Sequence, residues 1–461
     1  MDYQSTRNSQ LRRDFKAAVS EGLAPDGGLY VPTSIPDLRN ELKTWQSWSY
    51  RQMAQRIYEL FAGDCLNAQE REHLLEQSLG RFKTTEVTPL HREGHTYILE
   101  LFHGPTLSFK DVALQTLGGL FEHWPLDKGE RTIVGATSGD TGSAAIAGVQ
   151  GKKGVRAFIL FPEGRVSPVQ ELQMTTVADK NIQCIGIQGS FDDCQNIVKE
   201  LFSDMTLREK LGLSAVNSIN WARITSQIVY YFFGYFQWLK KSGHQYGDLL
   251  DVCVPTGNFG DMFAGYMARS MGCPLGKMVI ACNDNDILTR FFETGAYSMR
   301  EVIPSWSPAM DIQISSNFER LLYLLQGRNC EVIAQQMLDL KNKKEFKVTK
   351  EVLQNFRAIF SAERVIGEEC LQTIREFERQ FGYTLDPHTA VGMRAAQKAL
   401  GPNSDVMCLA TAHPGKFQEA VEKALGRSYQ LPEALESLKG KPTRKIVLPA
   451  SAEAVKKVIL G

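Results

Sequence analysis

The spacing of apolar and polar residues changes near residue 95. Before that point, turn-rich segments alternate with helical periodicity, and residues 50–63 repeat apolar positions at helical spacing up to Gly63, a predicted C-cap. After it, short continuous apolar runs alternate with helical segments, which is typical of a parallel sheet covered on both faces. The predicted buried strands cover residues 131–137, 155–162, 181–189, 249–256, 277–284 and 405–412. The predicted fold class is therefore α/β.

This pattern predicts three parts of the chain. Residues 1–95 form an N-terminal, mainly helical segment, and residues 96–245 form a first α/β domain. Residues 246–461 form a second α/β domain with a helical insertion at about 319–384. The most apolar stretch, residues 224–239, is shorter than the roughly 20 residues that a membrane span needs, and it contains two glutamines. We expect it to be a buried helix and expect no membrane partner.

The composition narrows the possible classes of function. The 461 residues include 52 basic and 52 acidic side chains, so the formal net charge is zero, which argues against a nucleic-acid partner. The nine cysteines form no CxxC pair and have no zinc-ligand spacing, which predicts buried thiols in a reducing compartment and no metal site. The first residues lack the apolar stretch of a secretory signal, so we expect a cytoplasmic protein.

Three predicted strands are followed by small-residue loops that lead into helices. The loops have the sequences "SGDTG" (138–142), "GNFGD" (257–261) and "AHPGKF" (412–417). Amide groups at the start of a helix attract anions, and glycines let the backbone come close to them. A well-capped turn explains any single loop of this kind, but three of them predict a site for several anionic groups. None matches a dinucleotide or Walker motif.

Lys110 lies among apolar neighbours in the segment "HGPTLSFKD" (103–111). An amine that is desolvated in such a cleft can form a Schiff base with an aldehyde, as pyridoxal phosphate requires. The simpler interpretation of Lys110 alone is a surface lysine or an ion pair with Asp111. The three loops favour the cofactor, and we expect Asp111 to cap the helix that follows.

Several segments together resemble the threonine synthase family in its longer bacterial and fungal type. They are "STRN", "GLAPDGGLYVP", "HGPTLSFKD", "GATSGDTGSAA", "NSINWARI", "VPTGNFGD", "DPHTAVG" and "ATAHPGKF", and they extend from residue 3 to about residue 425. The resemblance implies a fold type II pyridoxal-phosphate enzyme, similar to the tryptophan synthase β subunit, with two open parallel-sheet domains. One departure is Asn8, where the family has glycine, and we expect asparagine to tolerate a left-handed turn there.

The resemblance also implies roles for individual residues around pyridoxal 5'-phosphate. Lys110 matches the Schiff-base lysine, and Thr411 matches the hydroxyl that meets the pyridine nitrogen. The loop around the cofactor phosphate matches Gly257, Asn258, Phe259, Gly260 and Asp261. Asn258 is a candidate for the 3-hydroxyl of the ring as well.

On the substrate side, the resemblance implies two groups of residues. The loop for the amino-acid carboxylate matches Ser138, Gly139, Asp140 and Thr141. Asn220 and Arg223, in "NSINWAR", are candidates for the substrate phosphate, although a structural ion pair explains Arg223 equally well. Three histidines inside the motifs are expected to stabilise turns rather than to act as bases, namely His103, His388 and His413.

The implied reaction converts the small molecule O-phospho-L-homoserine and water to L-threonine and phosphate, with the Lys110 amine as the base that moves protons. We expect a monomer or a homodimer. The alternatives are a related phospho-lyase that releases 2-oxobutyrate, a threonine or serine dehydratase, and a pyridoxal-phosphate-binding protein without turnover. Intact Lys110, Thr411 and "SGDTG" argue against the last.

Overall fold

The computed structural model describes residues 1–126, 129–214 and 216–461. Its N-terminal part packs helices around a small antiparallel sheet in the order β2-β1-β3. The segment 50–63 forms α2, and Gly63 ends it with a φ of 52°, as predicted. The elements of this part are β1 (Tyr3–Ser5), β2 (Arg12–Arg13), α1 (Phe15–Glu21), β3 (Tyr30–Pro32), α2 (Tyr50–Ala62) and α3 (Ala68–Leu79).

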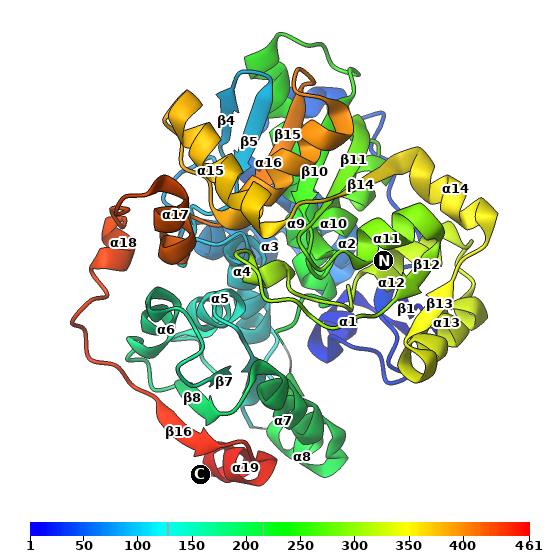
Figure 1. Ribbon diagram of the computed structural model, residues 1–461. Coiled ribbons are helices and arrows are strands. Elements are labelled where there is room, and N and C mark those ends of the chain that lie inside the picture. The colour runs from blue at the N-terminus through cyan, green and yellow to red at the C-terminus, as the bar shows by residue number, and fades with distance from the viewer. Residues whose placement is uncertain (127–128, 215) are drawn as a thin grey trace.

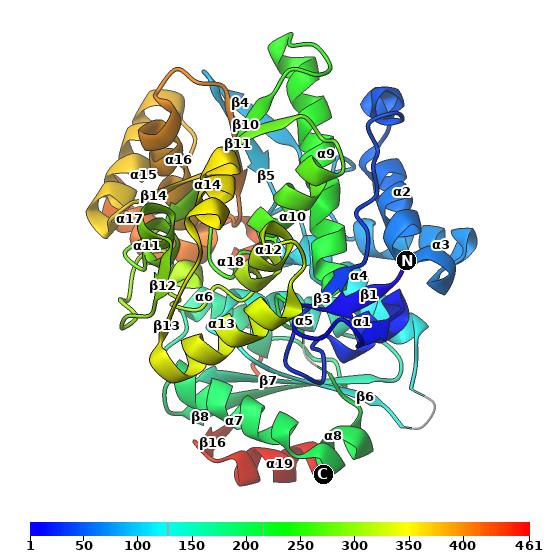
Figure 2. The same ribbon diagram turned by 90° about the vertical axis from the view of Figure 1, so that its right-hand side faces the viewer.

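A five-stranded parallel sheet forms one of two α/β units, with the strand order β16-β8-β7-β6-β9. Successive side chains of a strand point to opposite faces of the sheet. Helices cover both of these faces. Figure 2 shows α5 and α6 on one face and α7, α8 and α19 on the other. The strands are β6 (Arg131–Ala136), β7 (Val155–Pro162), β8 (Ile182–Gln188), β9 (Leu213–Ser214) and β16 (Ile446–Pro449). The helices are α5 (Asp140–Val149), α6 (Pro168–Thr175), α7 (Phe191–Ser203), α8 (Met205–Leu211) and α19 (Ala452–Leu460).

A six-stranded sheet forms the other unit, with the order β14-β11-β10-β15-β5-β4 (Figure 1). All neighbours are parallel except the edge strand β4. Helices α9 and α10 pack in the core on one face, and α15 and α16 pack on the other. The strands are β4 (Leu90–Glu93), β5 (Thr96–Glu100), β10 (Leu250–Pro255), β11 (Leu275–Cys282), β14 (Phe360–Arg364) and β15 (Val406–Ala410).

The remaining helices and the small sheet β12-β13 surround this second unit. The elements are α4 (Lys110–His123), α9 (Trp221–Ser242), α10 (Gly260–Ser270), α11 (Ile287–Thr294), β12 (Ala296–Ser298), α12 (Phe318–Leu325), α13 (Cys330–Lys343), β13 (Glu345–Lys347), α14 (Lys350–Ile359), α15 (Gly367–Phe381), α16 (Pro387–Leu400), α17 (Gln418–Leu425) and α18 (Glu433–Glu436).

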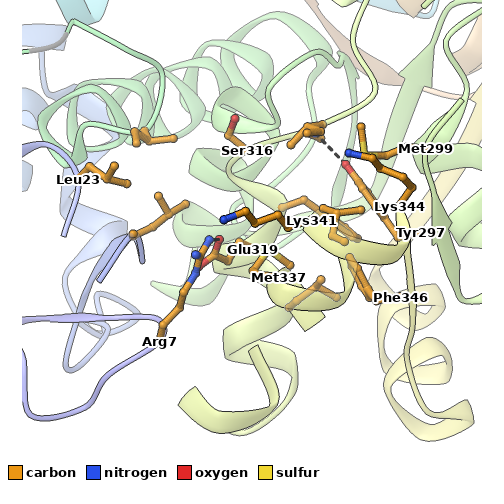
Figure 3. A pocket seen from close by; sticks show the side chains of 18 residues that line it. Arg7, Leu23, Tyr297, Met299, Ser316, Glu319, Met337, Lys341, Lys344 and Phe346 are labelled. Carbon is orange, nitrogen blue, oxygen red and sulfur yellow. Dashed lines mark hydrogen bonds and ion pairs between the residues drawn. The ribbon is translucent and has the colours of Figure 1, made fainter. Parts of the chain in front are cut away.

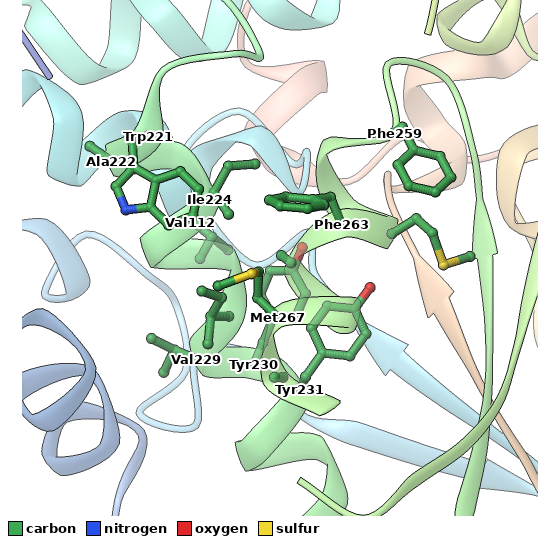
Figure 4. Close-up of a cluster of buried hydrophobic side chains, with 14 of the residues drawn as sticks. Val112, Trp221, Ala222, Ile224, Val229, Tyr230, Tyr231, Phe259, Phe263 and Met267 are labelled. Atoms are coloured by element: carbon green, nitrogen blue, oxygen red, sulfur yellow. The ribbon is translucent and has the colours of Figure 1, made fainter. Parts of the chain in front are cut away.

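Helix α9 is the centre of the main core, as the apolar stretch predicts. Every residue from Trp221 to Trp238 is buried. Figure 4 shows Trp221, Tyr230 and Tyr231 of α9 facing Phe263 and Met267 of α10. Within the described part of the chain, no helix is long and apolar enough to cross a membrane. The helix instead joins the N-terminal part to the six-stranded unit.

Strand pairing differs from the expected division of the chain at three places. Strand β5, expected in the first α/β domain, pairs with β15 of the six-stranded sheet. Strand β16, near the C-terminus, pairs with β8 of the five-stranded sheet. Strand β14 lies within the expected helical insertion and forms the edge of the larger sheet. These pairings join segments that are far apart in sequence, so local periodicity does not reveal them.

Candidate functional site

Lys110 is brought into the site by a short antiparallel contact between two loops. The amide of Phe109 donates to the carbonyl of Thr411 over 2.8 Å, and the amide of His413 donates to the carbonyl of Leu107 over 3.1 Å. Leu107 has a φ of 60°, which turns the chain directly before α4. Lys110 is the first residue of α4, so the structure brings it and Thr411 together at the carboxyl end of β15.

Asp111 has a different role from the predicted helix cap. Its carboxylate accepts hydrogen bonds from the amide and the hydroxyl of Thr106, over 2.8 and 2.7 Å. A Cβ at Gly104 would overlap the side chain of Asp111, so the Gly-Pro turn has to pass close to it. Asp111 therefore fixes the loop before Lys110 instead of the helix after it.

The amine of Lys110 is buried beside Asp140. Lys110 is 8% exposed, and its Nζ lies 3.3 Å from Oδ2 of Asp140. Burial lowers the pKa of Lys110, the nearby Asp140 acts to raise it, and the positive charges of Lys416 and Arg223 lower it further. An amine with a lowered pKa loses its proton more easily, as a nucleophile or base requires.

The loop after β6 is shaped by a threonine that the sequence analysis missed. The Thr137 hydroxyl accepts hydrogen bonds from the amides of Gly139 and Gly142, each over 2.9 Å. Gly139 has a φ of 139°, and a Cβ there would approach the Gln170 side chain to 2.5 Å. Ser138 is exposed and Thr141 is half-buried. A threonine directly before the small-residue loop is the sequence signal for Thr137.

Asp140 lies at the centre of a buried polar cluster. Its Oδ1 accepts from Nε2 of Gln170 over 2.8 Å and lies 3.1 Å from Nζ of Lys416. Burial acts to raise the pKa of Asp140, but the charges of Lys416 and Lys110 outweigh it, so the pKa is lowered and the carboxylate is ionised. Lys416 was not predicted as a site residue, although it lies in the third small-residue loop. The feature of the sequence that could have identified Lys416 is a second lysine among apolar and small residues.

The loop between β10 and α10 contributes backbone amide groups to the site. Phe259 has a φ of 62°, and a Cβ at Gly257 would come within 2.6 Å of the carbonyl of Ala309. Within the described residues, the amides of residues 257–260 make no hydrogen bond to the protein. Four successive amides at the start of a helix form a cradle that fits a phosphate.

Asp261 does not have the predicted position at the cofactor loop. Its Oδ1 accepts hydrogen bonds from the hydroxyls of Tyr230 and Tyr231, over 2.5 and 3.0 Å. Burial raises the pKa of Asp261 to about 6, and the two tyrosine hydroxyls act to lower it. Its side chain anchors α10 to α9 and is turned away from the cradle of amides 257–260.

Protein groups engage the side chain of Asn220 but, among the described residues, not that of Arg223. The Asn220 side chain accepts from the amide of Ala222 and donates to the carbonyl of Val19 over 2.8 Å, so it caps α9 instead of having the predicted substrate contact. Arg223 is 4% exposed, and its guanidinium has no hydrogen-bond or ion-pair partner among the residues that the structure describes. Burial lowers the pKa of Arg223 to about 10, so it remains a cation at neutral pH. It can therefore hold an anion.

The residues of the site fit pyridoxal phosphate. The amides of 257–260 fit its phosphate, the buried Lys110 amine fits its aldehyde, and the Thr411 hydroxyl, which has no partner in the described part of the protein, fits its ring nitrogen. The three histidines of the motifs contact protein groups: His103 pairs with Glu100, and the other two accept hydrogen bonds from backbone amides. Nε2 of His388 accepts from the amide of Ala309, and Nδ1 of His413 accepts from the amide of Gly415.

A separate cavity is lined in part by Ser315 and Ser316, whose hydroxyls contact Gly257 and Asn258. It has a volume of about 440 Å³ and is bordered by Arg7, Glu319 and Lys341 (Figure 3). Arg7 of the "STRN" segment donates to both carboxylate oxygens of Glu319, over 2.9 and 2.7 Å. Asn8 next to it does not adopt a positive φ, contrary to the expected left-handed turn. Lys110 does not border this cavity, so it is distinct from the predicted site.

Comparisons with known proteins match the whole chain. Family models described as "Threonine synthase N terminus", "Pyridoxal-phosphate dependent enzyme" and "Threonine synthase, C-terminal" match residues 2–79, 82–412 and 389–459. The threonine synthase of Saccharomyces cerevisiae is 43% identical over 99% of this chain and 97% of its own length. That of Pseudomonas aeruginosa is 44% identical over 97% and 96%.

The fold agrees with these matches. The crystal structure of pyridoxal-phosphate-bound threonine synthase from Brucella melitensis is similar, with a TM-score of 0.94 and 42% sequence identity. The likeness covers 100% of this chain and 98% of that one. The predicted α/β architecture of fold type II is confirmed.

Proposed function

Because the chain belongs to the threonine synthase family of pyridoxal-phosphate-dependent enzymes, we propose that it converts O-phospho-L-homoserine and water to L-threonine and phosphate. The observation that carries this proposal is the combination of two buried cations: Lys110, whose pKa is lowered, and Arg223, which has no partner among the described residues. A dehydratase acts on amino acids that carry no phosphate group, so it has no need for a buried arginine such as Arg223.

The residues of this chain divide the work of the reaction. The amides of 257–260 hold the cofactor phosphate, and Thr411 meets the ring nitrogen. The bound cofactor supplies an electron sink next to the amino group of the substrate. The Lys110 amine takes the proton from Cα of the substrate and moves protons at Cβ, which its flexible stem can reach. The 138–141 loop binds the substrate carboxylate, and Arg223 binds the phosphate before and after it leaves Cγ.

We further propose that the protein works in the cytoplasm, as a monomer or a homodimer. Seven of the nine cysteine side chains are buried, namely Cys184, Cys194, Cys253, Cys273, Cys282, Cys370 and Cys408. Burial raises the pKa of several of these thiols, so they persist in the unreactive protonated form that suits a reducing compartment.

Lys110→Ala tests the assignment of the central lysine. We expect this variant to lose the visible absorbance of lysine-bound cofactor and all turnover, while Lys439→Ala, which removes an exposed lysine paired with Glu436, keeps both. The assay should measure phosphate, threonine and 2-oxobutyrate released from O-phosphohomoserine. Phosphate released with threonine in equal amounts supports the proposal, and release of 2-oxobutyrate instead would identify a phospho-lyase.

A further inference from the structure

Lys416 is the most deeply buried lysine of the site, with a relative exposure of 1%. Its Nζ donates to the carbonyl of Thr106 and to Oε1 of Gln173, each over 2.7 Å, and lies 3.1 Å from Oδ1 of Asp140. The ammonium therefore has two hydrogen-bond acceptors and one ion-pair partner. Burial of an ammonium costs several kcal/mol, and an apolar residue of similar volume is often as stable at such a position. The charge itself therefore needs an explanation.

The position of Lys416 joins the two α/β units. It follows β15 of the six-stranded sheet, whereas Gln173 lies on α6 and Asp140 begins α5, both on the five-stranded unit. Thr106 belongs to the loop that carries Lys110. One ammonium thus fixes the cofactor-lysine loop and the 138–141 loop relative to each other.

Asp140 lies between two lysines, with one carboxylate oxygen facing each. Only Lys416 can remain a charged partner throughout the reaction, because the Lys110 nitrogen binds the cofactor and gives up its proton when it acts as a base. We propose that Lys416 is a positioning residue that serves as the permanent counter-ion of Asp140 and so sets the charge next to Lys110. This inference rests on the proposed function, in which Lys110 is the cofactor lysine.

The other charged groups near this pair are few. Arg223 of α9 faces Lys110, and His388 of α16 is close to Asp140. Asp111 has its carboxylate turned to Thr106. Lys416 opposes a proton on the Lys110 nitrogen in two ways: it repels the positive charge directly, and it shares the Asp140 carboxylate that would otherwise stabilise that charge alone. Removal of its charge should therefore make the Lys110 nitrogen hold its proton to higher pH.

The test is a pH titration of the visible absorbance of the holoenzyme, which reports protonation of the nitrogen contributed by Lys110. We expect Lys416→Met to move the midpoint upward by about one pH unit or more. Lys416→Arg retains the charge and should stay within about 0.3 unit of the parent, despite its different shape. Lys445→Met, which breaks ion pairs to Glu163 and Glu171 away from the site, is the matched control and should not move it.

Two results would overturn the inference. A Met variant that binds the cofactor and keeps the parental midpoint shows that the charge of Lys416 does not act on Lys110. An Arg variant that shifts as far as the Met variant assigns the effect to packing instead of charge. If Lys416→Met does not fold, Lys416→Gln replaces it, since glutamine can still donate to Thr106, and the same midpoint decides. Failure of the proposed function is distinguishable, because Lys110→Ala would then keep the visible band.

Discussion

Two buried charged residues near the site differ in what surrounds their charge. Tyr230 and Tyr231 donate hydrogen bonds to Oδ1 of Asp261, so the protein itself stabilises one oxygen of this carboxylate. The Arg223 guanidinium has no such partner among the described residues, and its burial is costly until an anion arrives. At the scale of the residue, Asp261 is therefore suited to hold two helices together, and Arg223 is suited to bind a ligand.

Asp261→Asn tests this difference through the pH dependence of stability. Burial raises the pKa of Asp261 to about 6 from an ordinary value of 3.8, so the folded state binds a proton that the unfolded state releases between these values. Stability therefore falls as the pH rises from about 4 to about 6 and stays reduced above that range. Asparagine retains an acceptor without the charge. We expect it to raise the free energy of unfolding at pH 8 by on the order of 2 kcal/mol, with no gain near pH 4, in urea titrations.

The control for this prediction is Asp37→Asn, which changes an exposed carboxylate beside Arg39. It should alter the free energy of unfolding by less than about 1 kcal/mol at either pH. The affinity of Asp261→Asn for pyridoxal phosphate should not weaken, because the carboxylate faces the tyrosines. Weaker cofactor binding in this variant would restore the original prediction that Asp261 is a cofactor ligand.

At the scale of elements, the separation of Lys110 from Asp140 depends on how closely two helices pack. Lys110 begins α4, and Asp140 begins α5. The helices meet at glycines: a Cβ at Gly118 would overlap the carbonyl of Gly148, and a Cβ at Gly148 would overlap the carbonyl of Leu114. This backbone contact leaves no room for any side chain, so it fixes the distance between the two loops.

Gly118→Ala should therefore push the two helices apart. Alanine favours a helix by about 1 kcal/mol over glycine, but overpacking against backbone costs about 1–3 kcal/mol or more, and the backbone cannot rotate away. We expect a net loss of stability and a marked loss of cofactor affinity, measured by thermal unfolding and by cofactor titration. Gly119→Ala is the matched control, since its Cβ would meet only the flexible end of Leu74, at 2.5 Å. Equal effects of the two substitutions would contradict the argument.

The elements also show how far the sequence could predict the structure. The buried strand β7 has the predicted bounds, because a mostly apolar run lies between Gly154 and Glu163. Ser190 and Asp193 form a capping box at the start of α7, which local sequence can indicate because the two residues are three positions apart. Strand β14 was missed because it is short, includes polar residues and lies at an edge. Lys110 and Arg223 could be predicted from motifs, whereas Val19, which accepts a hydrogen bond from Asn220, lies 201 residues away in sequence.

At the scale of the whole molecule, the C-terminal segment returns to the five-stranded unit. Lys445 forms ion pairs with Glu163 and Glu171, β16 then extends the sheet beside β8, and α19 packs on α7. The segment leaves the second unit after α18 and crosses to the first one (Figure 1). It therefore covers an edge strand that would otherwise offer unpaired backbone groups to other chains.

Removal of residues 442–461 should destabilise the five-stranded unit in particular. The truncation exposes the edge of β8. It also exposes the surface on which three buried residues of α19 pack, namely Ala452, Val455 and Ile459. Loss of about 5 kcal/mol of apolar burial lowers the unfolding temperature by on the order of 10 °C and favours aggregation. Leu460→Ser is the control, since this side chain is 45% exposed and its replacement should change the unfolding temperature little.

Because the 138–141 loop belongs to this unit and the 257–260 cradle to the other, we expect the truncation to lower substrate affinity more than cofactor affinity. A truncated protein with unchanged unfolding temperature and substrate affinity would show that the segment is only appended to the enzyme.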